Sequence, residues 1–193
     1  MMLLCWRIAR WGNYRVVNFG YRSLRVTIDE AARQLAEKIR EVLTEDVSSR
    51  MPLHFVAHSM GGLVLRLALS MIPVPFKGRI VFFATPHVGT HWGDHFGWVG
   101  RWVPALAWLG RRESSLAHML PVPYGWVYGT VGGRFDWMVP DHFTKLPGEA
   151  DHATVWTAHT MIFRRTIARS AVDFLTLGRF RANFFRRTTL GKD

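Results

Sequence analysis

One stretch constrains the fold more than any other: LHFVAHSMGGLVLRLAL, residues 53–69. Its apolar run is broken by a small residue, a histidine and a serine, and helix-forming residues resume after two glycines. The first half has the length of a buried strand, and the second half has the apolar content of a helix that begins near Met60. Ser59 is therefore expected on a sharp turn from strand to helix, where Ala57 and Gly61 give the turn room.

A turn of this kind has a chemical use. It lifts the Ser59 hydroxyl above the carboxyl edge of a sheet, which is the usual ligand side of an α/β fold. The helix start directs its free N–H groups and its dipole toward negative charge, so the Met60 N–H is predicted to donate to an oxyanion. An ordinary structural turn is the alternative, and the position between a buried strand and an apolar helix favours a nucleophile.

Short apolar runs alternate with longer amphipathic ones along most of the chain, which indicates a parallel sheet flanked by helices. Helices are expected after a capping-box start at residues 27–30, from about 60 to 71, and from just after His159. Strands are expected at residues 15–21, 53–58, 78–86, 126–131 and 153–158.

The length and composition favour a single domain over residues 1–193, because 49% hydrophobic residues can form one sizeable core. Between about residues 87 and 123 the pattern becomes irregular and rich in tryptophan. We interpret this segment as a cap insertion over the edge of the sheet. Whether it only covers the core or also shapes access to Ser59 is left open by the sequence.

Targeting and redox signals point to the cytoplasm. No apolar run reaches the roughly 18 residues that span a bilayer, and the opening MMLLCWRIARWG does not have the form of a secretory signal. The single cysteine, Cys5, excludes an internal disulfide framework. We therefore expect a soluble, cytoplasmic chain.

The formal net charge is +11, but the basic residues are spread along the sequence. Their densest cluster is at the C-terminal end, where residues 160–193 hold eight Arg or Lys and two Asp. A solvated face with a basic tail is the favoured interpretation, and weak contact of that tail with an anionic membrane surface is the alternative. No nucleic-acid motif accompanies the charge, so no nucleic acid partner is expected.

A serine hydroxyl is a weak nucleophile, and in this type of fold an acid and then a histidine follow it in the sequence. The histidines beyond the insertion are His142, His152 and His159. His159 is favoured as the base, because it lies between the last strand and the last helix. His58 adjoins the serine, so its side chain is expected to point elsewhere, as packing or support.

Three aspartates lie in the interval where the acid should be: Asp136, Asp141 and Asp151. Asp136 comes soon after the strand at 126–131, from which an acid loop usually reaches the histidine. Asp151 precedes the last strand, and Asp141 falls between the two. The residue pattern favours Asp136 and keeps the others open.

Four segments together resemble a known superfamily: NFGYRS, HFVAHSMGGLVLR, GRIVFFATPHVGT, and DWMV with TKLPGEADH and HTM near the end. They are similar to the α/β hydrolases, and more narrowly to the bacterial lipase and esterase branch that includes relatives of triacylglycerol lipases and of inositol-deacylating enzymes. The resemblance implies an α/β-hydrolase-type, mostly parallel sheet flanked by helices. It covers nearly all of the chain outside the tryptophan-rich section.

The resemblance also implies which aspartate is the acid. In this branch the late acid opens an Asp-Gly-x-Val segment that is followed by Thr, a basic residue and Leu. Residues 136–139 and 144–146 fit this pattern, with Trp137 in place of Gly. Asp136 is therefore the implied acid, and Asp151 is kept in reserve.

Such enzymes further imply a strand ending in His-Gly ahead of the first helix, whose loop donates a second oxyanion N–H. The sequence opens inside that helix, so we expect an N-terminally truncated fold, from either a start placed too late or a weak or inactive relative. Loss of one oxyanion donor typically lowers turnover by about 10²- to 10³-fold.

The expected function is hydrolysis of a carboxylic ester, either a small molecule or a lipid with an apolar acyl group. Ser59 would attack, His159 would act as the base, Asp136 would orient it and Met60 would donate to the oxyanion, with no cofactor. A non-catalytic binding module of the same fold and an acyltransferase with the same triad are the alternatives.

Histidines recur at a regular spacing near the start of the tryptophan-rich segment, and a metal site is the less favoured interpretation of them. His87, His91 and His95 recur every fourth residue beside Asp94, which on a helix would form a metal-binding face. Glycines interrupt that spacing at positions 89 and 93, and the segment follows a strand. No metal is therefore expected.

Overall fold

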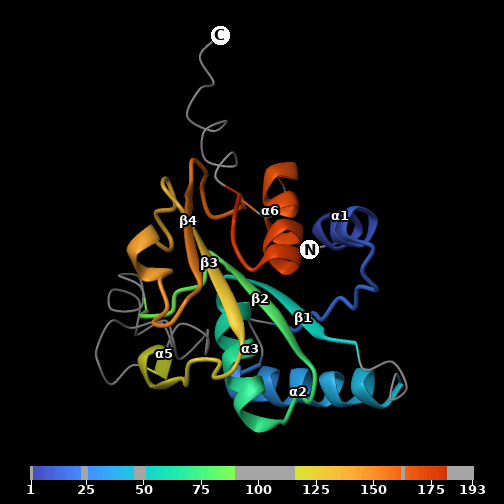
Figure 1. Cartoon of the computed structure of the whole chain (residues 1–193). Helices are drawn as coiled ribbons and strands as arrows, with labels where there is room; N and C mark the ends of the chain where they lie inside the picture. Colours follow the sequence, from blue (N-terminus) through green and yellow to red (C-terminus); the bar gives the residue numbers. More distant parts are fainter. Residues whose placement is uncertain (1, 23–25, 46–50, 90–115, 162–163, 182–193) are drawn as a thin grey trace.

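The computed structural model describes residues 2–22, 26–45, 51–89, 116–161 and 164–181. They form a parallel four-stranded sheet in the order β1-β2-β3-β4, flanked by helices (Figure 1). The strands are β1 (Leu53–His58), β2 (Lys77–Phe83), β3 (Val127–Gly133) and β4 (Asp151–Val155). The long helices are α1 (Met2–Gly12), α2 (Ile28–Glu45), α3 (Met60–Met71) and α6 (Arg165–Leu177), and the short ones are α5 (Leu116–Met119) and the 3₁₀ turn η3 (Asp141–Phe143).

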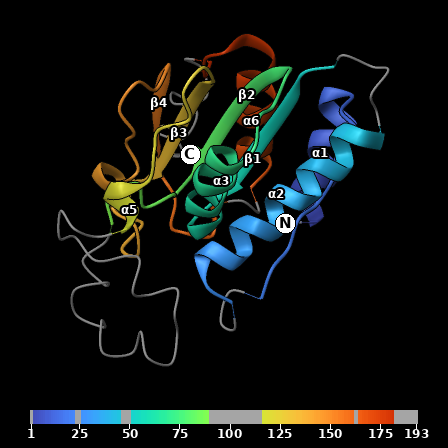
Figure 2. The same ribbon diagram turned by 90° about the horizontal axis from the view of Figure 1, so that it is seen from below.

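The sheet divides the core into two clusters, and the interior strand β2 contributes side chains to both. Ile80 and Phe82 face a cluster with α2 and α3, whereas Val81 and Phe83 face a cluster with α1 and α6. All four side chains are fully buried, as the period of two in a strand covered on both faces requires. The α2–α3 layer therefore lies on one face of the sheet and the α1–α6 layer on the other (Figure 2).

The sequence predicts several elements closely. The strand at 53–58 and the helix at 60–71 coincide with β1 and α3. The capping-box start is present at α2, where the Thr27 hydroxyl accepts the Glu30 N–H at 3.2 Å. The later strands are shifted by one to three residues from their expected bounds, because apolar runs do not mark where a ladder stops.

The strand expected at residues 15–21 is wrong. This segment follows α1 without regular secondary structure, although Tyr14 and Val16 pack against the α1–α6 side of the core. A strand requires a neighbour with which to exchange backbone hydrogen bonds, and β1 pairs with β2 in the described sheet. Residues 15–21 have the composition of a strand but pair with none of the strands in the described part of the chain.

The last helix begins later than expected. It starts at Arg165 rather than directly after His159, so His159 lies in an irregular connection between β4 and α6. Four of its predicted inward residues are buried: Ile167, Ala171, Phe174 and Leu175. Ile162 and Phe163, which were also expected to face inward, lie outside the described residues, as does most of the tryptophan-rich segment.

The carboxyl edge of the sheet is held by hydrogen bonds that continue past the strands. Ser59, Ala84 and Arg134 each follow a strand. Their N–H groups donate to the carbonyls of Phe83, Val131 and Val155, which lie at or near the carboxyl ends of the neighbouring strands, at 2.8 Å. The residues just beyond β1, β2 and β3 are therefore fixed relative to one another. This edge is where side chains from distant parts of the sequence can meet with defined geometry.

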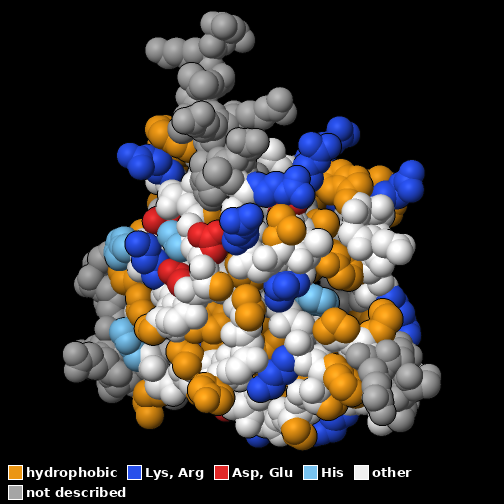
Figure 3. Space-filling model, viewed as in Figure 1, with side chains coloured by type: hydrophobic (Ala, Val, Ile, Leu, Met, Phe, Trp, Pro, Cys, Tyr) orange, Lys and Arg blue, Asp and Glu red, His pale blue; other side chains and the backbone are white. Residues whose placement is uncertain are grey.

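The positions of Lys and Arg on the surface agree with the prediction that the positive charge is dispersed. On the face shown in Figure 3, Lys and Arg side chains are spread among apolar side chains rather than gathered in one block. Among the described residues, no helix has both the length and the apolar character that crossing a bilayer requires.

Candidate active site

Ser59 occupies the turn between β1 and α3 in a conformation that L-residues seldom adopt. Its φ is 53° and its ψ is −134°. The turn is pinned from both sides, because the Ser59 N–H bonds the Phe83 carbonyl at 2.8 Å and the Ser59 carbonyl accepts the Gly62 N–H at 3.0 Å. Ser59 stands at the N-cap position, yet its hydroxyl makes no capping bond to the helix. The hydroxyl is thereby left for other partners.

Of the two glycines at the start of α3, Gly62 is the one that meets a distant segment closely. A Cβ added at Gly61 would have no neighbouring atom within 4 Å, whereas one at Gly62 would lie 2.2 Å from the Thr85 hydroxyl oxygen. Gly62 therefore allows α3 to approach the segment after β2 closely. The role of Gly61 within the turn stays a prediction, and a motif along one chain segment does not reveal the approach of Gly62 to Thr85.

Ser59, His159 and Asp136 form a continuous hydrogen-bonded series. His159 Nε2 lies 2.9 Å from Ser59 Oγ, and His159 Nδ1 lies 2.8 Å from Asp136 Oδ2. An ionised carboxylate only accepts hydrogen bonds, so Nδ1 carries the ring proton and Nε2 is free to accept from the serine hydroxyl. Both separations are within hydrogen-bond distance.

The Asp136 side chain is fully buried, and its second carboxylate oxygen, Oδ1, also accepts hydrogen bonds. Asp136 Oδ1 accepts the backbone N–H groups of Met138 at 3.0 Å and Val139 at 2.9 Å. Trp137, which stands where glycine is usual, is 65% exposed and is not among the residues with positive φ. A side chain at this position therefore points away from the carboxylate and leaves both amide bonds intact.

The other two aspartates have different partners. Asp151 begins β4, at the opposite edge of the sheet from Ser59, and its carboxylate accepts the Phe180 N–H at 2.8 Å. Asp141 accepts hydrogen bonds from Thr154 at 3.0 Å and His152 at 3.2 Å. Burial alone would raise the pKa of Asp141, but the His152 and Thr154 bonds hold that pKa below its ordinary value. Neither carboxylate reaches His159.

The remaining late histidines also serve elsewhere. His152 bridges Asp141 to the Thr130 hydroxyl, which lies 2.7 Å from its Nδ1. His142 lies on η3, with its ring against that of Phe143. Of the three candidates for a base, His159 alone is brought to Ser59.

His58 has a contact that the sequence did not reveal. Its Nε2 lies 2.9 Å from the backbone carbonyl oxygen of His159. Burial is the main cause that lowers the pKa of His58 to about 4. The sequence predicts packing or support for this side chain, and its position directly before Ser59 is the available signal.

Met60 is the first residue of α3, so its N–H is one of the amides that a helix cannot satisfy internally. It adjoins Ser59 at the carboxyl edge of the sheet. Its side chain packs on the α2–α3 core. The geometry is compatible with a donor to negative charge that develops near Ser59 Oγ.

The buried side chain of Arg66 forms hydrogen bonds with both segments that flank residues 90–115. Arg66 is the one charged residue of α3 and is 3% exposed. Its guanidinium donates to the carbonyls of His87 (3.3 Å), Ala117 (3.4 Å) and Pro121 (3.2 Å), and also to that of Leu120. Burial lowers the pKa of Arg66 to about 10, which still leaves it charged at neutral pH. A lone arginine in an apolar helix was the sequence signal for this role.

We expect Arg66→Met to lower the free energy of unfolding by about 3 kcal/mol or more, because the buried carbonyls would lose their donor. Arg66→Lys should recover only part of this loss, since an ammonium cannot span the same set of carbonyls. Urea unfolding measures both, with Arg40→Met on the exposed side of α2 as the control. Equal midpoints for Arg66→Met and Arg40→Met would contradict the assignment.

His87 belongs to this cluster rather than to a metal site. Its Nδ1 lies 3.3 Å from the Arg66 guanidinium, and burial followed by the Arg66 charge holds the pKa of His87 well below its ordinary value. A neighbouring cation disfavours a metal ion at this ring. The other residues of the histidine pattern, His91, Asp94 and His95, lie outside the described residues.

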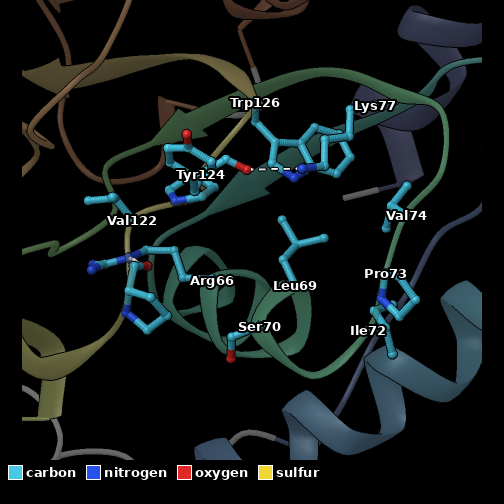
Figure 4. A pocket seen from close by; sticks show the side chains of 12 residues that line it. Arg66, Leu69, Ser70, Ile72, Pro73, Val74, Lys77, Val122, Tyr124 and Trp126 are labelled. Atoms are coloured by element: carbon cyan, nitrogen blue, oxygen red, sulfur yellow. Dashed lines mark hydrogen bonds between the residues drawn. The ribbon is translucent and has the colours of Figure 1, made fainter.

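A pocket of about 230 Å³ lies away from Ser59 (Figure 4). It is lined by the second half of α3, the connection to β2 and residues 121–126, so it opens near the amino ends of β2 and β3. Lys77 closes one side by donating to the Tyr124 carbonyl at 3.1 Å. None of Ser59, Asp136 and His159 contributes to it.

The parallel sheet, the helices on both faces and the strand–serine–helix turn define an α/β-hydrolase fold. The same fold is found in solved structures at low identity. The mature form of the Bacillus licheniformis lipase BlEst2 has a TM-score of 0.59 and 17% identity, over 79% of this chain and 74% of the lipase. A Paleococcus ferrophilus monoacylglycerol lipase has a TM-score of 0.52 and 13% identity, over 82% and 78% of the two chains.

The Legionella pneumophila phospholipase PlaB has a TM-score of 0.53 and 16% identity over 68% of this chain, which spans only 34% of the phospholipase. Residues 25–112 match the family described as "Putative serine esterase (DUF676)". The matched segment contains Ser59 and ends before Asp136 and His159. No curated protein matches the chain by sequence.

Proposed function

We propose that this chain is a serine hydrolase that cleaves carboxylic esters through a Ser59–His159–Asp136 triad. The observation that carries the proposal is the pair of contacts at 2.9 Å and 2.8 Å that joins the three side chains at the carboxyl edge of the sheet. The family match around Ser59 supports the same chemistry. All reacting groups come from the protein, so the mechanism requires no cofactor.

In this mechanism, Ser59 Oγ attacks the ester carbonyl carbon while His159 Nε2 takes the hydroxyl proton. Asp136 keeps the ring proton on Nδ1 and stabilises the imidazolium that forms. The carbonyl oxygen becomes an oxyanion, to which the Met60 N–H donates. When the intermediate collapses, His159 returns its proton to the leaving alcohol. Water then attacks the acyl-enzyme with His159 as the base.

The described surface around Asp136 supports an apolar acyl group. Four large apolar side chains, three beside Asp136 in the sequence and one shortly before His159, are 41–65% exposed: Phe135, Trp137, Met138 and Trp156. The Phe135 and Trp156 rings meet edge to face at 5.3 Å, and the Arg134 guanidinium lies over Trp156 at 5.0 Å. Exposed apolar groups beside reacting groups are suited to contact a hydrocarbon chain.

We expect the chain to hydrolyse p-nitrophenyl butyrate with a kcat/KM roughly 10-fold above that of the acetate, since each buried methylene contributes about 0.8 kcal/mol. The double variant Phe135→Ser/Trp137→Ser should reduce this ratio. Tyr124→Ser, at a 90% exposed aromatic beside the remote pocket, is the matched control. An acetate preference in the wild type would contradict an apolar acyl site.

A fluorophosphonate probe tests the serine independently of turnover. Labelling of a single residue, Ser59, would support an activated nucleophile even where hydrolysis is slow. A chain that neither hydrolyses these esters nor reacts with the probe would contradict the proposal and favour the binding-module alternative.

Contact of the basic C-terminal end with an anionic membrane surface stays a prediction. Within the described part of that end, Arg181 already pairs with Asp173 at 3.2 Å, which reduces the charge available to lipid headgroups.

A further inference from the structure

His58 and Ser59 are consecutive, and both contact His159. Ser59 Oγ meets the imidazole, and His58 Nε2 meets the backbone carbonyl oxygen at 2.9 Å. A carbonyl oxygen only accepts, so His58 must carry its proton on Nε2 and donate it. The two histidine rings also lie together, with their centroids 5.0 Å apart. The last residue of β1 and the turn that follows it therefore contact both the peptide and the side chain of His159.

The hydrogen bond from His58 matters because the backbone at His159 is not part of a helix or strand. His159 lies in the connection between β4 and α6 rather than in either element. The N–H of Thr157 bonds the Val155 carbonyl at 2.9 Å, and the Thr157 carbonyl accepts the Phe135 N–H at 3.1 Å, so the segment is anchored two residues before His159. The His58 bond anchors the peptide of His159 itself.

We propose that His58 is a positioning residue for His159. The inference rests on the proposed function, in which His159 is the general base. An imidazole that serves Ser59 on one side and Asp136 on the other tolerates little rotation, because turning toward one partner lengthens the bond to the other. By holding the His159 carbonyl, the His58 N–H fixes the orientation in which both bonds are short.

Electrostatics favours a histidine here over a permanent cation. Burial is the main reason that the pKa of His58 falls to about 4, and the electrostatic interaction with His159 acts in the same direction. The bond to the His159 carbonyl and the charge of Asp136 oppose this shift. His58 is therefore neutral near pH 7, and it donates a hydrogen bond without repelling the imidazolium that forms on His159 during the reaction.

Three variants separate positioning from simple packing. His58→Leu keeps the bulk but removes the donor. His58→Gln retains an N–H at a similar reach. His54→Leu is the matched control, because His54 lies on the same strand and also bonds backbone, accepting the Arg79 N–H at 3.0 Å, away from Ser59.

We expect His58→Leu to lower kcat for p-nitrophenyl butyrate by about 10- to 100-fold, with KM within about threefold of wild type. His58→Gln should return kcat to within about threefold of wild type. His54→Leu should lower the melting temperature and leave kcat unchanged. A His58→Leu variant that behaves like His54→Leu would reduce His58 to a packing role, and so would a His58→Gln variant as slow as His58→Leu.

Failure of the proposed function can be told apart from failure of this inference. If wild type hydrolyses esters and Ser59→Ala does not, the function stands whatever the His58 variants do. If wild type is inactive, nuclear magnetic resonance of the ¹⁵N-labelled histidine rings near pH 7 still tests the contact. A neutral His58 with its proton on Nε2, together with His159 ring signals that change in His58→Leu, would support it. A charged or Nδ1-protonated His58 would overturn it.

Discussion

Ser59→Ala is expected to lower kcat for ester hydrolysis by about 10⁴- to 10⁶-fold, the largest effect of any single substitution in the chain. The proposed acyl-enzyme forms on Ser59 Oγ, so the variant has no nucleophile with which to begin the first step. What remains is the contribution of substrate binding and of the Met60 N–H. Initial rates with p-nitrophenyl butyrate measure the loss, and labelling by a fluorophosphonate should disappear with it.

The fold should tolerate this substitution. The Ser59 hydroxyl makes no capping bond to α3, and alanine adopts the same positive-φ turn at a similar cost. The melting temperature should therefore remain close to that of wild type. Ser70→Ala is a suitable control, because Ser70 lies on the same helix and its hydroxyl bonds the Leu67 carbonyl at 2.7 Å. Activity that survives Ser59→Ala, or that Ser70→Ala removes equally, would contradict the mechanism.

Local sequence patterns predict a helix or strand correctly where the residues that determine it are close together in the sequence. The apolar run of β1, the spacing of α3 and the capping box before α2 are each complete within a short window, and the structure places these elements as expected. The strand expected at residues 15–21 failed for the opposite reason. Its composition is that of a strand, but a strand is stable only as a member of a sheet, and this segment has no pairing partner among the described residues.

The same division applies to the candidate site. Ser59 could be recognised from its own turn, and His159 from its place after the last strand. The choice of Asp136 among three aspartates needed a family resemblance, because only the folded sheet shows that Asp151 lies at the opposite edge. The close approach of Gly62 to Thr85 joins residues that are far apart in the sequence. The same is true of the hydrogen bonds from Arg66 to backbone carbonyls. No reading along the chain could have supplied these contacts.

Asp136→Asn should lower kcat by about 10³- to 10⁴-fold while leaving the fold intact. The two amide donors at Oδ1, from Met138 and Val139, require an acceptor, so the asparagine oxygen will occupy that position. Its NH₂ group then faces His159 Nδ1 and can only donate to it. The ring proton is forced onto Nε2, where it points at the serine hydroxyl. His159 in this tautomer cannot accept the Ser59 proton.

The orientation of the Asp136 carboxylate therefore makes the substitution a test of tautomer rather than of charge alone. Asp151→Asn is the matched control, because it alters a carboxylate that bonds only the Phe180 N–H among its described contacts, at the other edge of the sheet. Its kcat should stay within about twofold of wild type. An Asp136→Glu variant retains an acceptor toward His159 and should lose less activity than Asp136→Asn. If Asp151→Asn is the slower variant, the acid has been assigned to the wrong residue, and the contact at 2.8 Å between Asp136 and His159 would then be structural.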